Sequence, residues 1–284
     1  MLKKILGVLK QKKPVQNTVS PEEVRLMAAR AAQRQKVGSG QFGQVYEGMP
    51  GSVIKEIPLE EKADLINEIN LQAKAAELGV APRIQETYMG PPQIGDTKVP
   101  IGPGPNPQMR GKITMQDLRQ NYTQLGTPTD LYNPQLNEAQ IKIAEVETYK
   151  QLSQLALNGI ALHDRHGQNI FVHNMTGRPM QIDFGLAQKL ETPGQRAGML
   201  AYNVGSGLQA AGLHEEASTL VQLVNEVGQF NPMTMNYDNP EAALNMAKQG
   251  LSRLQKIKSP QIQQIAQYNQ SQKKEFEDAL DLFQ

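Results

Sequence analysis

The 284-residue chain contains no cysteine and no tryptophan, and aromatic residues make up only 5% of it. Without cysteine the chain forms no disulfide, no thiolate metal site and no cysteine nucleophile, and it is compatible with any redox compartment. The shortage of aromatic side chains disfavours a surface on which nucleic acid bases stack. Charge is balanced as well, with 29 basic and 28 acidic residues. We therefore expect no nucleic acid partner.

Long apolar runs are also missing, since no stretch approaches the roughly 20 residues that a membrane span requires. The sequence predicts a soluble protein of the cytoplasm. The cytoplasm of a host cell is included in this prediction. Residues 1–13 place Leu2, Ile5, Leu6 and Leu9 at helical spacing among lysines, which predicts a short basic amphipathic helix. Two interpretations stay open for this leader: it packs on the domain or frays, or it contacts a membrane surface or a partner.

Turn residues and hydrophobic spacing divide the chain into a strand-rich first part and a helical second part. With 39% apolar residues the chain is long enough to form a proper core. Short strands are expected over residues 36–57, and an irregular loop rich in proline and glycine over 89–107. The expected helices cover residues 20–35, 59–78, 137–157 and 262–282, with others after Gln188 that break near Pro193 and around Asn231-Pro232.

The most informative segment is Asp164-Arg165-His166-Gly167-Gln168-Asn169, which is followed by a hydrophobic strand and then by Asp183-Phe184-Gly185. An aspartate with an asparagine five residues later supplies one candidate acid or base and one oxygen ligand. The second aspartate supplies another oxygen ligand for magnesium. This combination is typical of phosphoryl transfer from ATP.

A glycine-rich pattern, GxGxxGxV, occupies residues 37–45. Its glycines let the backbone N–H groups of a hairpin approach phosphate oxygens with no side chain in the way. The pattern alone is weak, because glycine-rich hairpins are common. Residues 44–48 look like a strand returning from a turn, whereas a dinucleotide-binding fold requires a helix there. The candidate nucleotide-binding residues of this loop are Gly38, Gly40, Gly43 and Val45.

Lys55 ends a short apolar strand, Ser52-Val53-Ile54-Lys55. Strand alternation places Val53 and Lys55 on one face, where the lysine can pair with the α- and β-phosphates. A single strand lysine is more often simply solvated, but Glu68 stands among apolar residues of the following helix and can hold Lys55 in an ion pair. Glu77 is the weaker alternative for that partner.

The glycine loop, the lysine and glutamate, and the catalytic segment follow one another in an order that resembles the protein kinase superfamily, over about residues 36–190. The Asp-Arg-His-x-x-Asn loop is similar to that of phosphatidylinositol 3- and 4-kinases and related atypical kinases. Reduced kinases of this kind are carried by bacterial effectors or phages. His166 also resembles the loop of aminoglycoside phosphotransferases.

The chain departs from ordinary protein kinases at the catalytic loop. Those kinases carry His-Arg-Asp and then a lysine two residues after the aspartate, whereas here His163 precedes Asp164 and His166 takes the lysine position. No Ala-Pro-Glu follows Asp183-Phe184-Gly185. Control through a phosphorylated activation loop is therefore not expected, and no peptide-docking signature is recognisable.

The resemblance implies that Asp164 orients the acceptor hydroxyl or accepts its proton. It implies that His166 stabilises the transferring phosphoryl group or shares the role of base. Asn169 and Asp183 would hold Mg2+. The residues expected to bind ATP are Gly38, Gly40, Gly43, Val45, Lys55 and Glu68.

The implied fold is α+β and bilobal, protein-kinase-like, with a small β-rich N-lobe that contains one main helix and a larger helical C-lobe. The ATP site would lie in the cleft between the lobes. The expected connection between them lies near residues 109–113. The expected domains are a basic amphipathic leader (1–19), the N-lobe with its preceding helix (20–112), the C-lobe (113–240) and a C-terminal helical extension (241–284).

The function expected from these residues is that of an ATP- and Mg2+-dependent atypical kinase that phosphorylates Ser or Thr hydroxyls of a protein substrate. The glycine loop and the Val-Ile-Lys strand favour a protein acceptor. A lipid or small-molecule kinase stays open, supported by the Asp-Arg-His loop and the basic leader. A third alternative is a kinase-shaped scaffold without activity, although the lysine and both aspartates of a live site are present.

Overall fold

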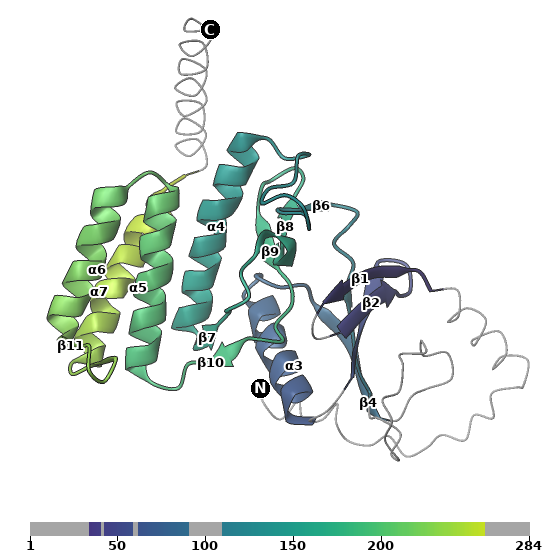
Figure 1. Cartoon of the computed structure of the whole chain (residues 1–284), viewed down its shortest axis with the longest axis horizontal. Coiled ribbons are helices and arrows are strands. Elements are labelled where there is room, and N and C mark those ends of the chain that lie inside the picture. The colour runs from purple at the N-terminus through teal and green to yellow at the C-terminus, as the bar shows by residue number, and fades with distance from the viewer. Residues whose placement is uncertain (1–33, 41–42, 59–61, 91–109, 259–284) are drawn as a thin grey trace, which may run out of the picture.

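The structure is a computed structural model that describes residues 34–40, 43–58, 62–90 and 110–258. Strands dominate its first part and helices its second (Figure 1). The strands are β1 (Lys36–Gly40), β2 (Gly43–Glu47), β3 (Ser52–Pro58), β4 (Ile84–Gly90), β5 (Arg110–Gln116), β6 (Tyr122–Gln124), β7 (Ile160–Ala161), β8 (Ile170–His173), β9 (Pro179–Gln181), β10 (Gln188–Lys189), β11 (Phe230–Asn231) and β12 (Asn236–Tyr237). The helices are α3 (Lys62–Glu77), α4 (Glu138–Leu157), α5 (Pro193–Ala210), α6 (His214–Gly228), α7 (Pro240–Lys256) and a 3-10 turn at Gly167–Asn169.

Several of the expected elements lie in parts of the chain that the structure does not describe. The leader of residues 1–13 and the helices expected over 20–35 and 262–282 lie outside the described residues. So does most of the loop expected over 89–107, of which residues 89 and 90 belong to β4. Within the described ranges, no helix combines the length and the apolarity that crossing a membrane demands.

A five-stranded antiparallel sheet, in the order β1-β2-β3-β5-β4, forms the first lobe. Helix α3 covers one face of it, because Leu65 is 1% exposed and packs in one cluster with Ile113 and Met115 of β5. Gly111 permits this approach, since a Cβ there would lie 2.4 Å from a Leu65 methyl carbon. The sheet and α3 together are the expected β-rich lobe with one main helix.

The connection between the lobes differs from the expectation. Strand β5 pairs with β3 along its whole length, from Ser52 opposite Gln116 to Pro58 opposite Arg110. Residues 110–113 are therefore inside the sheet, and the chain leaves the first lobe only after Gln116. The expected boundary between residues 112 and 113 falls in the middle of a strand.

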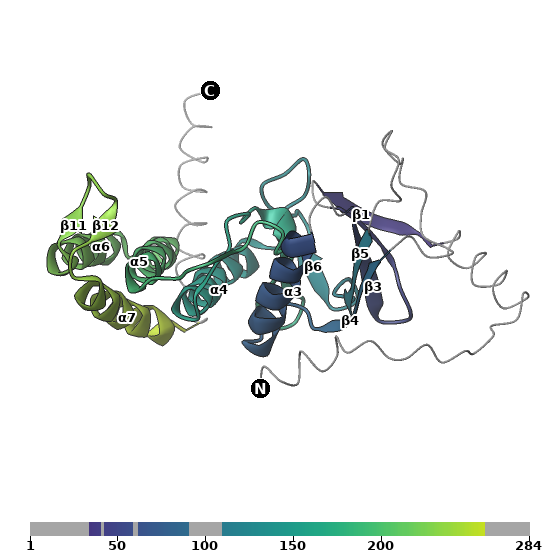
Figure 2. The ribbon, with the colours of Figure 1, turned by 90° about the horizontal axis from the view of Figure 1, so that it is seen from below.

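Helices α4 to α7 form the second lobe, and both views show α4 between α3 and the group α5–α7 (Figures 1 and 2). Pro193 opens α5 after a capping box made by Thr192 and Gln195, and the β11–β12 hairpin separates α6 from α7, so both expected breaks are present. Apolar residues of α7, Leu251 and Leu254 among them, belong to the same buried cluster as those of α5 and α6. The described part of the expected extension, 241–258, is thus integral to the helical lobe.

A second buried cluster joins the two lobes. It brings Leu71 and Ala75 of α3 together with Leu152 and Leu155 of α4, and Phe184 lies among them with 0% exposure. Burial of such a side chain contributes about 1.5–3 kcal/mol, so this contact fixes the segment around Phe184 against both lobes. The described architecture is the bilobal, protein-kinase-like α+β fold that the sequence predicts.

Candidate active site

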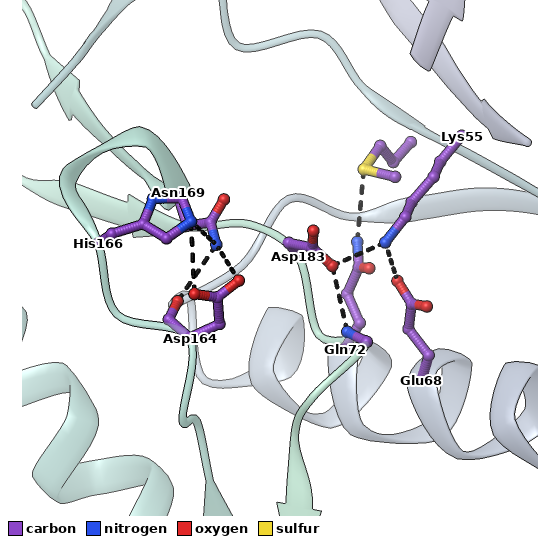
Figure 3. Close-up of polar contacts among 9 residues, drawn as sticks. Lys55, Glu68, Gln72, Asp164, His166, Asn169 and Asp183 are labelled. Carbon is purple, nitrogen blue, oxygen red and sulfur yellow. Dashed lines mark hydrogen bonds and ion pairs between the residues drawn. The ribbon is translucent and has the colours of Figure 1, made fainter. Parts of the chain in front are cut away.

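Lys55 lies on β3, where it lines the cavity between the lobes and faces α3. Its Nζ is 2.7 Å from Glu68 Oε1 and 2.8 Å from Asp183 Oδ1 (Figure 3). The lysine and the glutamate are both buried, at 6% and 4% exposure. The ion pair predicted between Lys55 and Glu68 is present, and the structure adds Asp183 as a second partner.

The charge state of Lys55 follows from this pairing. Burial by itself lowers the pKa of a lysine, but the adjacent carboxylates of Glu68 and Asp183 outweigh burial and raise the pKa of Lys55 above its usual value. For Glu68, burial is the largest influence and raises its pKa, while Lys55 acts in the opposite direction. Lys55 therefore remains a cation at neutral pH, in a place where phosphate oxygens can reach it.

Asp183 has an unusual backbone, with a φ of +59°. Aspartate tolerates this left-handed conformation better than most residues, and the neighbours hold it there. Phe184 is locked in the cluster between the lobes, Gly185 N donates to Asp183 Oδ1 at 3.2 Å, and Ile182 N donates to Asn169 O at 2.9 Å. The last bond ties the Asp183 segment to the catalytic loop.

The catalytic loop brings Asp164, His166 and Asn169 into one group (Figure 3). Asn169 Nδ2 donates to Asp164 Oδ2 at 3.0 Å and to the Asp164 carbonyl at 3.2 Å. His166 Nε2 lies 3.3 Å from Asp164 Oδ1 and 3.2 Å from Asn169 Nδ2. Asn169 is buried, whereas the side chains of Asp164 and His166 are 29% and 50% exposed. An acceptor molecule can therefore reach the two expected catalytic side chains.

Asn169 and Asp183 suit a magnesium ion, because in the described part of the chain each has a side-chain oxygen that accepts no hydrogen bond. Among the described residues, Asn169 uses its amide nitrogen for hydrogen bonds while no group donates to Oδ1, and Asp183 likewise keeps Oδ2 without a donor. Mg2+ prefers oxygen ligands and is commonly held by one or two carboxylates together with substrate phosphates. No cluster of three or more His, Cys, Asp or Glu suited to a metal occurs in the described ranges. Substrate phosphates and water would supply the other ligands.

The glycine pattern lies on the β1–β2 hairpin, where Gly40 pairs with Gly43. Only glycine fits at position 43 without a steric clash, because a Cβ there would lie 2.4 Å from the Glu56 carbonyl oxygen of β3. Gly38 and Val45 line the cleft cavity together with Lys55. The residues between Gly40 and Gly43 are outside the described ranges.

The cavity between the lobes has a volume of about 160 Å³. Cavities on the order of 150 Å³ hold a single aromatic ring. Its apolar lining comes from both lobes, with Val37, Val53, Met115, Leu118, Phe171 and Ile182. At its edge, Gln116 N donates to Arg83 O and Asp117 N to Gly51 O, whereas the N–H of Leu118 has no such partner among the described residues. One free donor thus lies beside an apolar, ring-sized space.

Asp117 and Arg119 were not recognised in the sequence, yet they line this cavity. Arg119 Nε and Nη2 donate to the Asp117 carboxylate at 3.0 and 2.8 Å, and Arg119 Nη2 also lies 3.4 Å from Glu47 Oε1. These contacts connect the segment between the lobes to β2. The signal in the sequence is an acidic and a basic residue two positions apart. This pattern is too common to identify these two residues as part of a site.

The hydrogen bonds of Asp117 predict that the free energy of unfolding depends on pH. Hydrogen bonds from Arg119 hold the pKa of the Asp117 carboxyl below its usual value, so the stabilisation is present above the unfolded-state pKa and disappears as the pH falls through the folded-state value. Because Arg119 is 42% exposed, we expect Asp117→Asn to cost no more than about 1 kcal/mol at pH 7. Urea unfolding at pH 7 and at pH 3 measures this, and an equal cost at both pH values would contradict it.

Arg165 fixes the catalytic loop to the helical lobe. Its Nη1 donates to Asn203 Oδ1 at 2.9 Å, and Asn203 Nδ2 donates to the Leu152 carbonyl at 3.1 Å. The guanidinium also lies over the Tyr202 ring, 4.8 Å from its centroid. Asn203, 2% exposed, was missed, and its only signal is a polar residue within the apolar stretch of α5.

No family model and no curated protein matches the chain. Among solved structures it is similar to the kinase PK-1 of Cydia pomonella granulovirus, with 16% sequence identity and a TM-score of 0.39 over 62% of this chain. The match spans 62% of the length of the granulovirus protein as well. A likeness this weak carries no weight, and the kinase-like fold is assigned from the sheet order, α3 and the lobe arrangement described above.

Proposed function

We propose that the chain is an ATP- and Mg2+-dependent phosphotransferase with an alcohol group as acceptor, an atypical kinase that acts on Ser or Thr of a protein. One observation carries the proposal: the Lys55 ammonium lies within 2.8 Å of both Glu68 and Asp183, although Asp183 is 128 positions away. A lysine held charged beside the expected metal ligand suits the α- and β-phosphates of ATP.

ATP would enter with its adenine ring in the cavity between the lobes, where the size, the apolar lining and the free Leu118 N–H favour it. The phosphates would then extend under the β1–β2 hairpin toward Lys55. Mg2+ would be held by Asn169 Oδ1 and Asp183 Oδ2, and when bound it neutralises charge on the β- and γ-phosphates.

In the transfer step, the acceptor hydroxyl oxygen forms a bond to the γ-phosphorus, and the bond from that phosphorus to the bridging oxygen breaks, so that ADP leaves. The hydroxyl proton passes to the Asp164 carboxylate, whose Oδ2 is oriented by Asn169. His166, half exposed beside Asp164, would donate a hydrogen bond to the phosphoryl oxygens.

Mass spectrometry after incubation with ATP and magnesium tests this function. Wild type should add phosphate to a generic protein acceptor or to itself, and Asp164→Ala should lower the rate about 10²- to 10⁴-fold because a general base is lost. Asp238→Ala, an exposed aspartate remote from the cleft, is the matched control and should leave the rate unchanged.

Acceptors offered in parallel separate the alternatives. The same assay with inositol lipids and with aminoglycosides reports a lipid or small-molecule kinase. Absence of transfer to any protein, the chain itself included, would count against the protein acceptor. No transfer to any acceptor, combined with no stabilisation by any nucleotide, would favour a scaffold without catalysis.

A further inference from the structure

A second cavity, of about 230 Å³, lies behind the catalytic loop. It is bounded by the segment after β6, by α4 and by the loop itself. Apolar side chains supply much of its lining, with Leu125, Leu152 and Ile170 at 4% exposure or less. Cavities on the order of 150 Å³ hold a benzene ring, so this space accommodates a ring with one small substituent.

Arg165 is the cationic side chain of this lining. Its Nη1 donates to Asn203 Oδ1 at 2.9 Å, and its guanidinium lies 4.8 Å from the centroid of the Tyr202 ring. Both of these partners are uncharged. In the described part of the chain, neither Nε nor Nη2 of Arg165 has a hydrogen-bond acceptor, and no carboxylate forms an ion pair with the guanidinium. Arg165 therefore keeps donors and a positive charge for an anion.

Glu145, the acidic side chain of the lining, is already balanced. Its Oε2 accepts from Lys142 Nζ at 2.9 Å, and its Oε1 accepts from the Tyr132 hydroxyl. The charge of Arg165 also acts on the cavity wall at Tyr149, because burial raises the pKa of that hydroxyl and Arg165 opposes the rise. Among the described residues, the charge of this lining that no ion pair balances is thus positive.

The cavity is in close contact with the catalytic loop. Arg165 directly follows Asp164, and Gly167, which also lines the cavity, accepts a hydrogen bond from Gly126 N at 3.0 Å. A Cβ on Gly167 would lie 2.8 Å from that nitrogen, so the loop and the opposite wall leave no room for a larger residue. An occupant bonded to Arg165 would thus contact the residue next to the proposed base.

We propose that this cavity binds a carboxylate on an apolar body no larger than one aromatic ring, with the carboxylate hydrogen-bonded to Arg165. Arginine suits a carboxylate because its planar guanidinium donates two parallel N–H bonds. One source of such a group is an acidic side chain close to the Ser or Thr that is phosphorylated, and the other is a free organic acid. Only the first source rests on the proposed phosphotransfer function.

Fragment binding tests the site without using activity. Benzoate and benzamide have nearly the same shape and differ in charge, and the methyl NMR signals of Leu125, Leu152 and Ile170 report binding in this cavity. We expect benzoate to bind wild type at least about fivefold more tightly than benzamide, the advantage of a charge-assisted hydrogen bond over a neutral one. Equal binding of the two probes at these methyl groups, or no binding of either, would overturn the assignment.

Arg165→Gln is the matched variant, because a glutamine amide can still donate to Asn203 but carries no charge. The preference for benzoate over benzamide should disappear in this variant. Arg253→Gln, which removes an exposed arginine paired with Glu216, is the control and should keep the preference. A preference for benzoate that survived in Arg165→Gln would contradict the proposal, because another group would then hold the anion.

Peptide pairs identify the source of the carboxylate. Glutamate or glutamine is placed at each of the three positions on either side of a single serine, and kcat/KM is measured for wild type and Arg165→Gln. We expect a glutamate preference of about fivefold at one position, lost in Arg165→Gln and competed by benzoate. Equal transfer to both peptides overturns the acceptor as source and leaves a free organic acid. No transfer to any peptide overturns the phosphotransfer function, while the fragment titration still decides on the site.

Discussion

Asp183→Ala is expected to abolish the stabilisation of the protein by ATP and magnesium. A ligand at about a hundred times its Kd stabilises the folded state by about 2.7 kcal/mol, which for a domain of this size raises the Tm by about 5–10 °C. In the proposed site Asp183 would supply a carboxylate oxygen to the metal, and its Oδ1 bonds Lys55. Without this side chain, the metal would lose a ligand and Lys55 would lose a partner that holds it toward the proposed phosphate site.

Differential scanning fluorimetry with ATP alone, magnesium alone and both together measures this effect. Asp183→Asn tests whether the negative charge is needed, since it keeps one side-chain oxygen but removes the charge. It should retain only a small part of the shift in Tm. Asp238→Ala should show the full wild-type shift. If Asp183→Ala kept the magnesium-dependent shift, the assignment of Asp183 as metal ligand would be wrong.

The contacts that the sequence predicted best are those with a local pattern. Alternation along β3 placed Val53 and Lys55 on one face, and both line the cavity between the lobes. Glu68 stood out as a carboxylate among apolar residues of a helix, and it lies 2.7 Å from Lys55. In both cases the period of the secondary structure decides the direction of the side chain, so a few residues carry the information.

The features that escaped prediction depend on partners far apart in the sequence. Strand β5 follows a segment rich in proline and glycine, and its membership in the sheet depends on β3, more than fifty positions earlier. Asn203 and Thr148 are polar residues in helices, and only the packing of neighbouring elements decides that each is buried. The contact between Lys55 and its second partner, Asp183, likewise depends on how the two lobes pack together.

Lys55→Met is expected to destabilise the protein by about 3–5 kcal/mol, because it leaves Glu68 buried without a cation. Glu68→Gln should cost less, since Lys55 keeps Asp183 as a partner at 2.8 Å. The double variant Lys55→Met with Glu68→Leu should recover much of the loss, because the buried charge of Glu68 is gone and only Asp183, whose side chain is 21% exposed, stays without its cation. Urea unfolding measures all three, and Lys189→Met, which breaks an exposed pair with Glu191, should change the free energy of unfolding by less than about 1 kcal/mol.

The loss in Lys55→Met should also depend on pH, in a direction that identifies its cause. Burial already raises the pKa of Glu68, and removing the lysine removes the influence that lowers it. A carboxyl whose folded-state pKa exceeds its unfolded-state value stabilises the fold at low pH and loses that contribution as the pH rises through the folded-state pKa. The variant should therefore be closest to wild type near pH 5 and furthest from it near pH 8. A deficit that stayed constant over this range would mean that lost packing, and not an unpaired Glu68, causes the destabilisation.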